Sequence, residues 1–287
     1  MRKPLAVLLL NNAAGRSKHF REEVTSILRQ KYQLEVLLAT DKKKTVEKLF
    51  KFSPEILFVA GGDGTINSTI PYLLKSRAVL GILPFGSGNG LARNLRIPLN
   101  PLKAAYHYLK ENIKEIDIGV LNDSIYFMNV AGVGFDAFIA HEFEKSLKRG
   151  ITPYVIAAIR GFFRFPEFEF EAEGEKGKAF IIAFANFSQY GGEARIAPGA
   201  NPSDGKLDIV FLRKPSFPYA VSRVPLLFTD MIARLKIYKR IQASEFTLKL
   251  NPPQLSHYDG ESGPSFQSLK VKVIPKAIKI LIKEKRG

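Results

Sequence analysis

Two glycine-rich segments carry the residue types that bind phosphate groups. The first is Gly61-Gly62-Asp63-Gly64-Thr65-Ile66-Asn67, and the second runs from Pro84 to Arg93 with the sequence PFGSGNGLAR. Glycine lets the backbone approach a ligand closely, and a helix that follows adds the positive end of its dipole. Each segment follows an apolar run and precedes a helix-like pattern. We therefore interpret both segments as phosphate-binding loops, with a tight turn as the alternative for the first.

Particular side chains in these loops suit a nucleotide. In the second loop, Ser87 and Asn89 offer hydrogen bonds to a phosphate, a ribose or an adenine edge, and Arg93 either reaches a phosphate or is an exposed helix residue. In the first loop, Asp63 either holds water on a metal and helps to position Mg²⁺, or caps a helix. The complete candidate nucleotide set in the two loops is Gly61, Gly62, Asp63, Gly64, Thr65, Asn67, Gly86, Ser87, Gly88, Asn89 and Arg93.

Other sites of known chemistry are excluded or weakly indicated. The chain has no cysteine, which excludes disulfides, thiolate metal sites and cysteine nucleophiles, and it has no G-x-x-x-x-G-K-[ST] motif. The segment from Gly132 to Ala137 matches G-x-G-x-x-G/A but lies in a β-rich region, so we interpret it as a structural turn. The four histidines have no metal-like spacing, and His257, although close to Asp259, is interpreted as a bystander.

The elements that must position these loops alternate between strands and helices. Apolar runs at Leu5–Leu10, Leu34–Ala39, Ile56–Ala60 and Val79–Leu83 predict strands, and the segments between them predict helices, one capped by Asp41. This order predicts a parallel sheet with helices on its faces. Ligands of such sheets bind beyond the carboxyl ends of the strands, where both glycine loops lie.

The chain beyond about Asp123 has a different texture. Strand-like segments follow one another, and turns such as Ser203-Asp204-Gly205 and Tyr258-Asp259-Gly260 separate them. We predict a mostly antiparallel β domain, with helical segments near Pro153–Phe163 and Pro218–Arg240. The predicted fold class is therefore an α/β domain of residues 1–122 followed by a β-rich domain of residues 123–276.

The composition favours a polyanionic partner. The chain has 287 residues, and 43 Lys and Arg against 27 Asp and Glu give a formal net charge of +16. Such a surplus suits nucleotide phosphates, nucleic acid or an anionic membrane surface. No nucleic-acid-binding module is recognisable, so we do not expect nucleic acid as the partner. The short apolar runs predict no membrane span and no signal peptide, and we expect a cytoplasmic protein.

These motifs together resemble the catalytic domain of the diacylglycerol kinase family, which includes bacterial lipid kinases and the sphingosine and ceramide kinases. Besides the two glycine loops, the resemblance covers several segments of the second half in the same order. They are Asn129 to Asp136, Tyr190-Gly191-Gly192, Ile196 to Ala200, Asp204 to Asp208 and Asp259-Gly260-Glu261. The resemblance implies an NAD-kinase-like α/β domain and a β-sandwich-like domain, with ATP in the cleft between them. It also implies that residues 277–287 return to the first domain.

The resemblance assigns roles to the acidic residues. Asp259 resembles the family's general base for the lipid hydroxyl, and Glu261, in the same motif, is expected to bind the nucleotide. Asp63 and Asp117 resemble the carboxylates of an aspartate–water–Mg²⁺ network. By the same resemblance, Asp204 and Asp208 are the ligands of a second, structural Mg²⁺. The implied cofactors are ATP and Mg²⁺, and the implied reaction is phosphorylation of a diacylglycerol or sphingoid-type lipid.

One position departs from the family pattern and keeps alternatives open. Bacterial diacylglycerol kinases tend to carry Asp where this chain has Gly90, whereas sphingosine kinases have a small uncharged residue there. The alternatives are an NAD kinase-like small-molecule kinase and a non-catalytic lipid- or nucleotide-binding protein.

A lipid kinase also has to reach a membrane. The segment Leu212–Arg240 mixes aromatic and basic residues, and Ile151–Phe163 is similar, so we expect peripheral association with an anionic membrane surface. The alternative is a core helix with a solvated charged face. A homodimer is compatible with the sequence.

Overall fold

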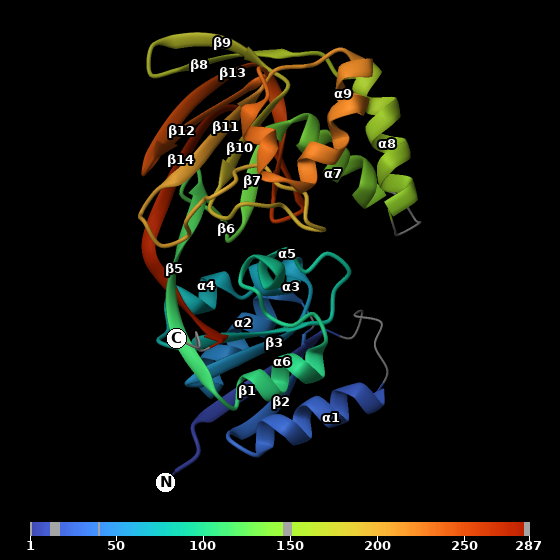
Figure 1. Cartoon of the computed structure of the whole chain (residues 1–287). Helices are drawn as coiled ribbons and strands as arrows, with labels where there is room; N and C mark the ends of the chain where they lie inside the picture. The colour runs from blue at the N-terminus through green and yellow to red at the C-terminus, as the bar shows by residue number, and fades with distance from the viewer. Residues whose placement is uncertain (1, 12–17, 40, 146–150, 284–287) are drawn as a thin grey trace. The chain divides into compact units, whose positions relative to one another are not determined.

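The computed structural model describes residues 2–11, 18–39, 41–145 and 151–283 (Figure 1). The chain forms two compact units, which we call unit 1 (Met1–Ile116 with Lys276–Gly287) and unit 2 (Asp117–Pro275). The chain passes between them within two strands, β5 (Glu111–Leu121) and β14 (Glu261–Lys283). The first boundary lies six residues before the predicted 122/123 boundary, because Asp117 already bonds to unit 2: its N–H donates to the Pro202 carbonyl at 2.7 Å.

Unit 1 contains a parallel sheet in the order β2–β1–β3–β4–β14. The first four strands are β1 (Leu5–Asn11), β2 (Gln33–Ala39), β3 (Ile56–Gly61) and β4 (Val79–Pro84). Every residue of β3 is buried. This burial explains why its sequence is a continuous apolar run rather than an alternating one. Strand β14 joins this sheet through Lys279 and Ile280, which pair with β4.

The helices of unit 1 follow the strands as the periodicity predicts. Val24, Ile27 and Leu28 of α1 face the core, and the Asp41 carboxylate caps α2 by accepting the Lys43 and Lys44 N–H groups at 2.9 and 3.2 Å. Helix α1 packs against α6, and α2 packs against α4 (Figure 1). The helices are α1 (Lys18–Arg29), α2 (Lys42–Phe52), α3 (Asp63–Asn67), α4 (Ile70–Leu73), α5 (Gly90–Asn94) and α6 (Pro101–His107).

Unit 2 is built around an antiparallel sheet in the order β12–β11–β10–β7–β13–β14. The hairpin β8–β9 adds to β13 through β8, while β5 pairs with β14 and β6 pairs with β5. The β-rich second half predicted from the sequence is therefore confirmed. The strands are β6 (Ile125–Phe127), β7 (Val130–Gly134), β8 (Phe168–Ala172), β9 (Glu175–Ala179), β10 (Ile181–Ala185), β11 (Leu207–Leu212), β12 (Tyr238–Ala243) and β13 (Glu245–Tyr258).

Strand β13 connects the part of the sheet that contains β8 and β9 to the part that contains β7, β10, β11 and β12. Its first half pairs with β8 through Leu248–Asn251, and its second half pairs with β7 through Ser256–Tyr258, with a register shift between Lys249 and Gln254. The core lies between the two parts and includes Phe127, Phe168, Phe184, Leu248 and Leu269. The sandwich-like arrangement therefore follows from one long strand that changes partners along its length.

The helical segments of unit 2 differ in part from the prediction. The helix α8 (Ile151–Arg164) confirms the prediction near Pro153–Phe163, and α7 (Phe135–Lys145) follows β7 directly, where a structural turn was expected. The helical segment predicted near Pro218–Arg240 is confirmed as far as Arg234, but it is not one continuous α-helix. It consists of α9 (Phe217–Arg223) and the 3₁₀ segments η1 (Val224–Phe228) and η2 (Asp230–Arg234), followed by β12. Pro225 explains the break, because proline cannot continue the α-helical hydrogen bonding. None of the helices in the described ranges is long and apolar enough to cross a membrane.

Candidate functional site

The two glycine loops of unit 1 touch each other through their backbones. They follow neighbouring parallel strands, in which Gly61 is the partner of Pro84, and the Phe85 N–H donates to the Gly61 carbonyl at 3.1 Å. A Cβ on Gly86 would lie only 2.5 Å from the Cα of Gly62. Real Cβ atoms do not approach another backbone atom so closely, so glycine at position 86 is needed for this contact.

Asp63 fastens the second loop to the first. Its carboxylate accepts the Gly90 N–H at 2.8 Å and the Leu91 N–H at 3.0 Å, the first two amides of α5. Burial raises the pKa of the Asp63 carboxyl above its usual 3.8, although the Leu91 and Gly90 N–H groups oppose the rise. The structure thus gives the Asp63 carboxylate a role in joining the loops. It also shows that these two amides of α5 are already bonded, whereas the sequence analysis assigned the helix start to phosphate.

The second loop also closes on itself. Asn89 adopts a positive φ of 49°, accepts the Gly86 N–H at 3.1 Å and donates to the Gly86 carbonyl at 2.7 Å. The Arg93 Nε donates to the Gly88 carbonyl at 3.2 Å. Both side chains therefore shape the loop, and Ser87 and Gly88 form its exposed tip. A nucleotide role for these residues stays a prediction.

Asn11 is a neighbour of the loops that the sequence analysis did not assign. It ends β1, and its Nδ2 donates to the Thr65 Oγ1 at 2.7 Å. The sequence did contain a signal for Asn11. A polar residue at the carboxyl end of a strand adjacent to β3 lies at the same sheet edge as the first loop. Asn67, in the same loop, is half-buried in α3.

In unit 2, Asp259 lies at the tip of the β13–β14 hairpin. Tyr258 and Glu261 are cross-strand partners, and Asp259 and Gly260 between them have φ values of 50° and 85°, as a two-residue type I′ turn requires. The Asp259 carboxylate accepts the Met128 N–H at 2.8 Å and the Asn129 N–H at 2.7 Å. The backbone N–H of Asp259 donates to the Val130 carbonyl at 2.9 Å. Turn geometry and three hydrogen bonds thus fix the orientation of this carboxylate.

Asn186 connects Asp259 to Asp117, and the sequence analysis missed it. Its side chain is buried, and its Nδ2 donates to the Asp117 carbonyl and to the Met128 carbonyl, each at 2.8 Å. Met128 in turn donates its N–H to Asp259. Asp117 is fully buried, and its Oδ2 accepts the Gly205 N–H at 2.7 Å. Two acidic residues far apart in the sequence therefore belong to one hydrogen-bonded network of unit 2.

The two predicted structural metal ligands, Asp204 and Asp208, each have a hydrogen-bond partner within the protein. Asp204 Oδ1 accepts the Lys206 N–H at 3.0 Å within its own turn. Asp208 is buried on β11, and the Arg240 Nε donates to its Oδ1 at 2.7 Å, while the Arg240 Nη1 donates to the Pro198 carbonyl at 2.6 Å. The Arg240 guanidinium is therefore the partner of the Asp208 carboxylate, whereas the sequence analysis assigned this carboxylate to Mg²⁺. Within the described ranges, no group of three or more His, Cys, Asp or Glu side chains could hold a metal ion. Mg²⁺ binding by Asp204 stays a prediction.

His257 is part of a buried polar cluster. Its Nε2 lies 2.9 Å from the Asp136 Oδ2, which also accepts the Tyr190 hydroxyl at 2.9 Å. Burial raises the pKa of the nearby Tyr258 hydroxyl, and the negative charges of Glu261, Glu144 and Asp259 raise it further. The predicted residues Asp259 and Glu261 therefore lie in an acidic environment at the hairpin tip.

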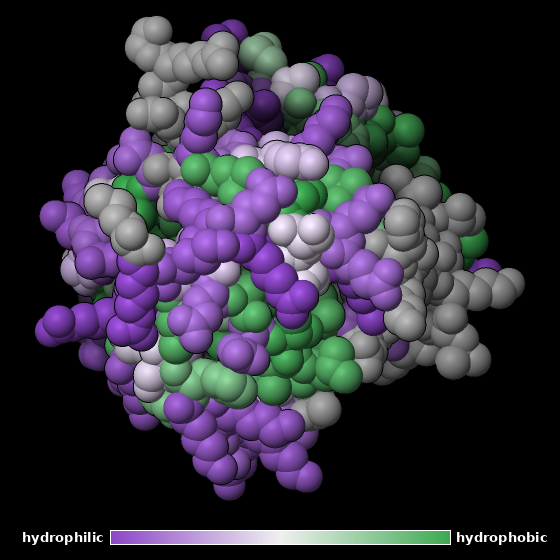
Figure 2. Space-filling model, turned by 90° about the horizontal axis from the view of Figure 1, so that it is seen from below, coloured by the Kyte–Doolittle hydropathy of each residue, from purple (hydrophilic) through white to green (hydrophobic). Residues whose placement is uncertain are grey.

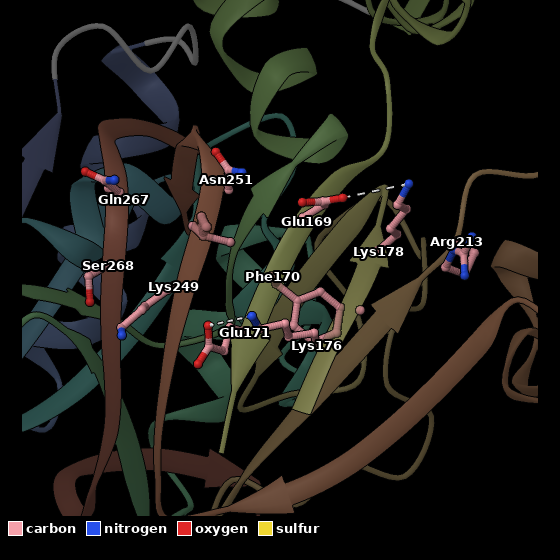
Figure 3. A pocket seen from close by; sticks show the side chains of 12 residues that line it. Glu169, Phe170, Glu171, Lys176, Lys178, Arg213, Lys249, Asn251, Gln267 and Ser268 are labelled. Atoms are coloured by element: carbon pink, nitrogen blue, oxygen red, sulfur yellow. Dashed lines mark ion pairs between the residues drawn. The ribbon is translucent and has the colours of Figure 1, made fainter. Parts of the chain in front are cut away.

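One surface pocket of unit 2 lies away from these residues. It has a volume of about 890 Å³, and the hairpin β8–β9 and strands β13 and β14 line it (Figure 3). Its charged residues largely pair with one another, as Lys176 does with Glu171 and Lys178 with Glu169, each at 3.9 Å. It contains none of the predicted site residues, and we assign it no role in the chemistry.

Two family models match the chain in tandem. Residues 5–121 match the diacylglycerol kinase catalytic domain, and residues 129–282, more than half of the chain, match the YegS C-terminal NAD kinase beta sandwich-like domain. The chain belongs to the family defined by the YegS C-terminal NAD kinase beta sandwich-like domain, here preceded by a diacylglycerol kinase catalytic domain. The predicted fold class, an α/β domain followed by a β-sandwich-like domain, is confirmed by the same matches.

Individual relatives agree with this assignment. The chain is 26% identical over 291 residues to a protein of Pectobacterium atrosepticum named "Probable lipid kinase YegS-like", with 96% of this chain and 95% of that protein covered. It is 29% identical over 297 residues to a protein of the same name from Yersinia enterocolitica, with 96% of each covered. A structure described as a diacylglycerol kinase from Bacillus anthracis shares the fold with a TM-score of 0.76 and 18% identity, with 99% of this chain and 98% of that chain covered.

Proposed function

We propose that the protein transfers the γ-phosphoryl group of ATP to a hydroxyl group of a lipid of the diacylglycerol or sphingoid class. Membership of the family and the names of the relatives support a lipid kinase. The single observation that carries the proposal is the carboxylate of Asp259, which two backbone N–H groups hold at the tip of a hairpin. A carboxylate of fixed orientation suits the acceptance of a proton from an alcohol.

The reaction would use the residues of this chain as follows. The lipid hydroxyl gives its proton to the Asp259 carboxylate, its oxygen forms a bond to the γ-phosphorus, and the bond to the β-phosphate oxygen breaks to release ADP. Since the carboxylate already accepts two N–H groups, it keeps its orientation while the proton moves. The glycine loops of unit 1 would bind the phosphates. Since Gly62, Gly64 and Gly88 have no side chain, the phosphates can approach the backbone closely there.

Mg²⁺ is part of the proposal, although Asp208 does not fit it. When bound, a divalent cation neutralises charge on the phosphates, and such ions commonly take most of their ligands from phosphate and water. We propose Asp63, Asp117 and Asp204 as the carboxylates to examine, because each has hydrogen bonds that fix its position. No step above depends on the metal.

The experiment is a transfer assay with γ-labelled ATP and Mg²⁺. Mixed micelles each carry one candidate acceptor: diacylglycerol, monoacylglycerol, sphingosine, ceramide or undecaprenol, with NAD tested in solution. The variant Asp259→Asn should lose transfer by about a hundredfold or more, the usual size of general-base effects. Asp123→Asn is the matched control, because Asp123 also lies in a positive-φ turn of unit 2 and its carboxylate forms an exposed ion pair with Lys272.

Three outcomes are informative. Label in one lipid, lost in Asp259→Asn and kept in Asp123→Asn, supports the proposal and names the substrate. Label in NAD alone refutes the lipid assignment. Nucleotide binding without transfer to any acceptor favours a non-catalytic binding protein, which the glycine at position 90 leaves open.

A further inference from the structure

One side of unit 2 exposes an unusual number of large apolar side chains. On α8, Ile156, Ile159 and Phe163 are 45%, 47% and 63% exposed. The exposed side chains of the segment from α9 to η2 are Val221, Val224, Leu227, Phe228 and Met231, with Val221 and Phe228 more than half exposed. We call these eight residues the docking face. Apolar surface of this kind on a monomer usually marks a binding site.

The two parts of the docking face meet where the end of α8 packs on the start of α9. The ring of Phe217 in α9 lies 4.7 Å from the ring of Phe163 and 5.6 Å from that of Phe162. Figure 1 shows α9 next to α8. The exposed residues of both elements therefore belong to one surface of unit 2.

The segment from α9 to η1 contributes little to the folded core. Neither α9 nor η1 contains a buried residue, although both are rich in Val, Leu and Phe. An exposed phenylalanine or valine in such a segment gains nothing from burial within the chain. The apolar composition is therefore explained by a partner rather than by folding.

The charge of the two segments that carry the docking face is almost entirely positive. Residues 151–164 contain no acidic residue, and residues 216–236 contain only Asp230, which pairs with Arg195. The exposed cations of these two segments are Arg160, Arg164, Arg223, Arg234 and Lys236. Exposed apolar side chains ringed by cations complement a surface that is apolar inside and negatively charged outside.

We propose that the docking face binds an anionic lipid bilayer, with Phe163 and Phe228 entering the interface and the surrounding cations contacting the lipid headgroups. This inference rests on the proposed function, because it states how the enzyme reaches a substrate held in a membrane. It is independent of the residues at the glycine loops and the Asp259 hairpin, and none of the eight residues has been assigned to the chemistry.

Unit 1 supplies the control residues. Its exposed large hydrophobic side chains are Val36, Leu38, Phe50, Phe52, Tyr106 and Ile113. Figure 2 shows one face of the molecule, on which hydrophilic residues lie between and around the hydrophobic areas. Tyr106 and Ile113 are 57% and 55% exposed, which matches the exposure of Phe163 and Phe228 at 63% and 51%.

The experiment measures sedimentation of the full chain with vesicles of phosphatidylcholine, with and without phosphatidylglycerol. We expect binding that needs phosphatidylglycerol and weakens at high salt. Phe163→Ser and Phe228→Ser should each weaken it by about tenfold, and Arg160→Gln by about fivefold. Tyr106→Ser and Ile113→Ser should leave it unchanged. Transfer to a lipid in detergent micelles is measured in parallel for every variant.

The outcomes separate this inference from the proposed function. Weaker vesicle binding with unchanged transfer in micelles supports the docking face. Equal binding by the Phe163, Phe228 and control variants overturns it, as does a wild-type protein that phosphorylates micellar lipid but binds no vesicle. If the Phe variants instead dissociate an oligomer and keep vesicle binding, the face is a contact between copies of the chain, and the proposal is also overturned. Vesicle binding without transfer to any lipid leaves the docking face supported and refutes the kinase.

Discussion

The contact between the two glycine loops makes a sharp prediction for Gly86→Ala. The new Cβ would lie 2.5 Å from the Gly62 Cα, whereas carbon atoms in contact are about 3.5–4.0 Å apart, so the loops must separate by about 1 Å. That movement stretches the bonds from Gly90 and Leu91 to Asp63, now 2.8 and 3.0 Å, beyond hydrogen-bonding range. Hydrogen bonds to a charged group contribute about 1.5–3 kcal/mol each, and overpacking costs about 1–3 kcal/mol.

Since backbone relaxation recovers part of these losses, we expect Gly86→Ala to lower the free energy of unfolding by about 2–4 kcal/mol. At roughly 4 °C per kcal/mol for a unit of this size, Tm should fall by about 8–16 °C. The matched control is Gly88→Ala, whose Cβ would lie 3.6 Å from the Asp63 Oδ2, an ordinary contact. Its effect should stay within about 0.5 kcal/mol.

Thermal unfolding of both variants and amide hydrogen exchange test the prediction. In Gly86→Ala, the amides of Gly90 and Leu91 should lose protection, while those of β1 keep it. Equal Tm values for Gly86→Ala and Gly88→Ala, or unchanged protection at the start of α5, would refute the inferred contact.

Three further variants probe other parts of the candidate site. The raised pKa of Asp63 means that its contribution to stability is complete below pH 3.8 and is lost as the pH rises through the raised pKa. The unfolding free energy of wild type relative to Asp63→Asn should therefore decline as the pH rises above 3.8, and a flat difference in urea titrations would contradict the assigned burial. Asn186→Ala removes two buried hydrogen bonds and should cost about 2–5 kcal/mol in urea unfolding, with a fall in kcat at unchanged KM for ATP; a cost below about 1 kcal/mol would mean that the network is not formed. Arg240→Met leaves the buried Asp208 carboxylate without its cation and should cost about 3–5 kcal/mol, whereas Lys239→Met, at an exposed ion pair, should cost less than about 1 kcal/mol; similar values for the two would contradict the buried pair.

Local features of the fold were predictable from the sequence. The apolar run of Leu5–Leu10 became β1, and Asp41 caps α2 through two hydrogen bonds, as its residue type and position indicated. Both features depend on residues within a few positions of one another. The helical segment predicted near Pro218–Arg240 is broken into an α-helix and 3₁₀ turns for a local reason as well, because Pro225 cannot continue the α-helical hydrogen bonding.

The partners of the polar site residues were not predictable in the same way. Asp63 was identified, but its bonds to Gly90 and Leu91 cross two elements. Asp208 was assigned to a metal, and its partner Arg240 comes from the neighbouring strand, 32 residues later. A carboxylate in a sequence motif is compatible with a metal, an amide or a guanidinium, and only the strand pairing brings one of these within reach.

The sequence by itself therefore determined the order of the elements, the two glycine loops, the Asp-Gly turn at position 259 and the excess of positive charge. These depend on backbone preferences and on composition, which act over short stretches of chain. The tertiary structure decided that Asn186 joins Asp117 to Asp259, and that α8 and α9 leave an apolar face to solvent. Such features arise from long-range pairing and packing, since burial and hydrogen-bond partners exist only once distant segments meet.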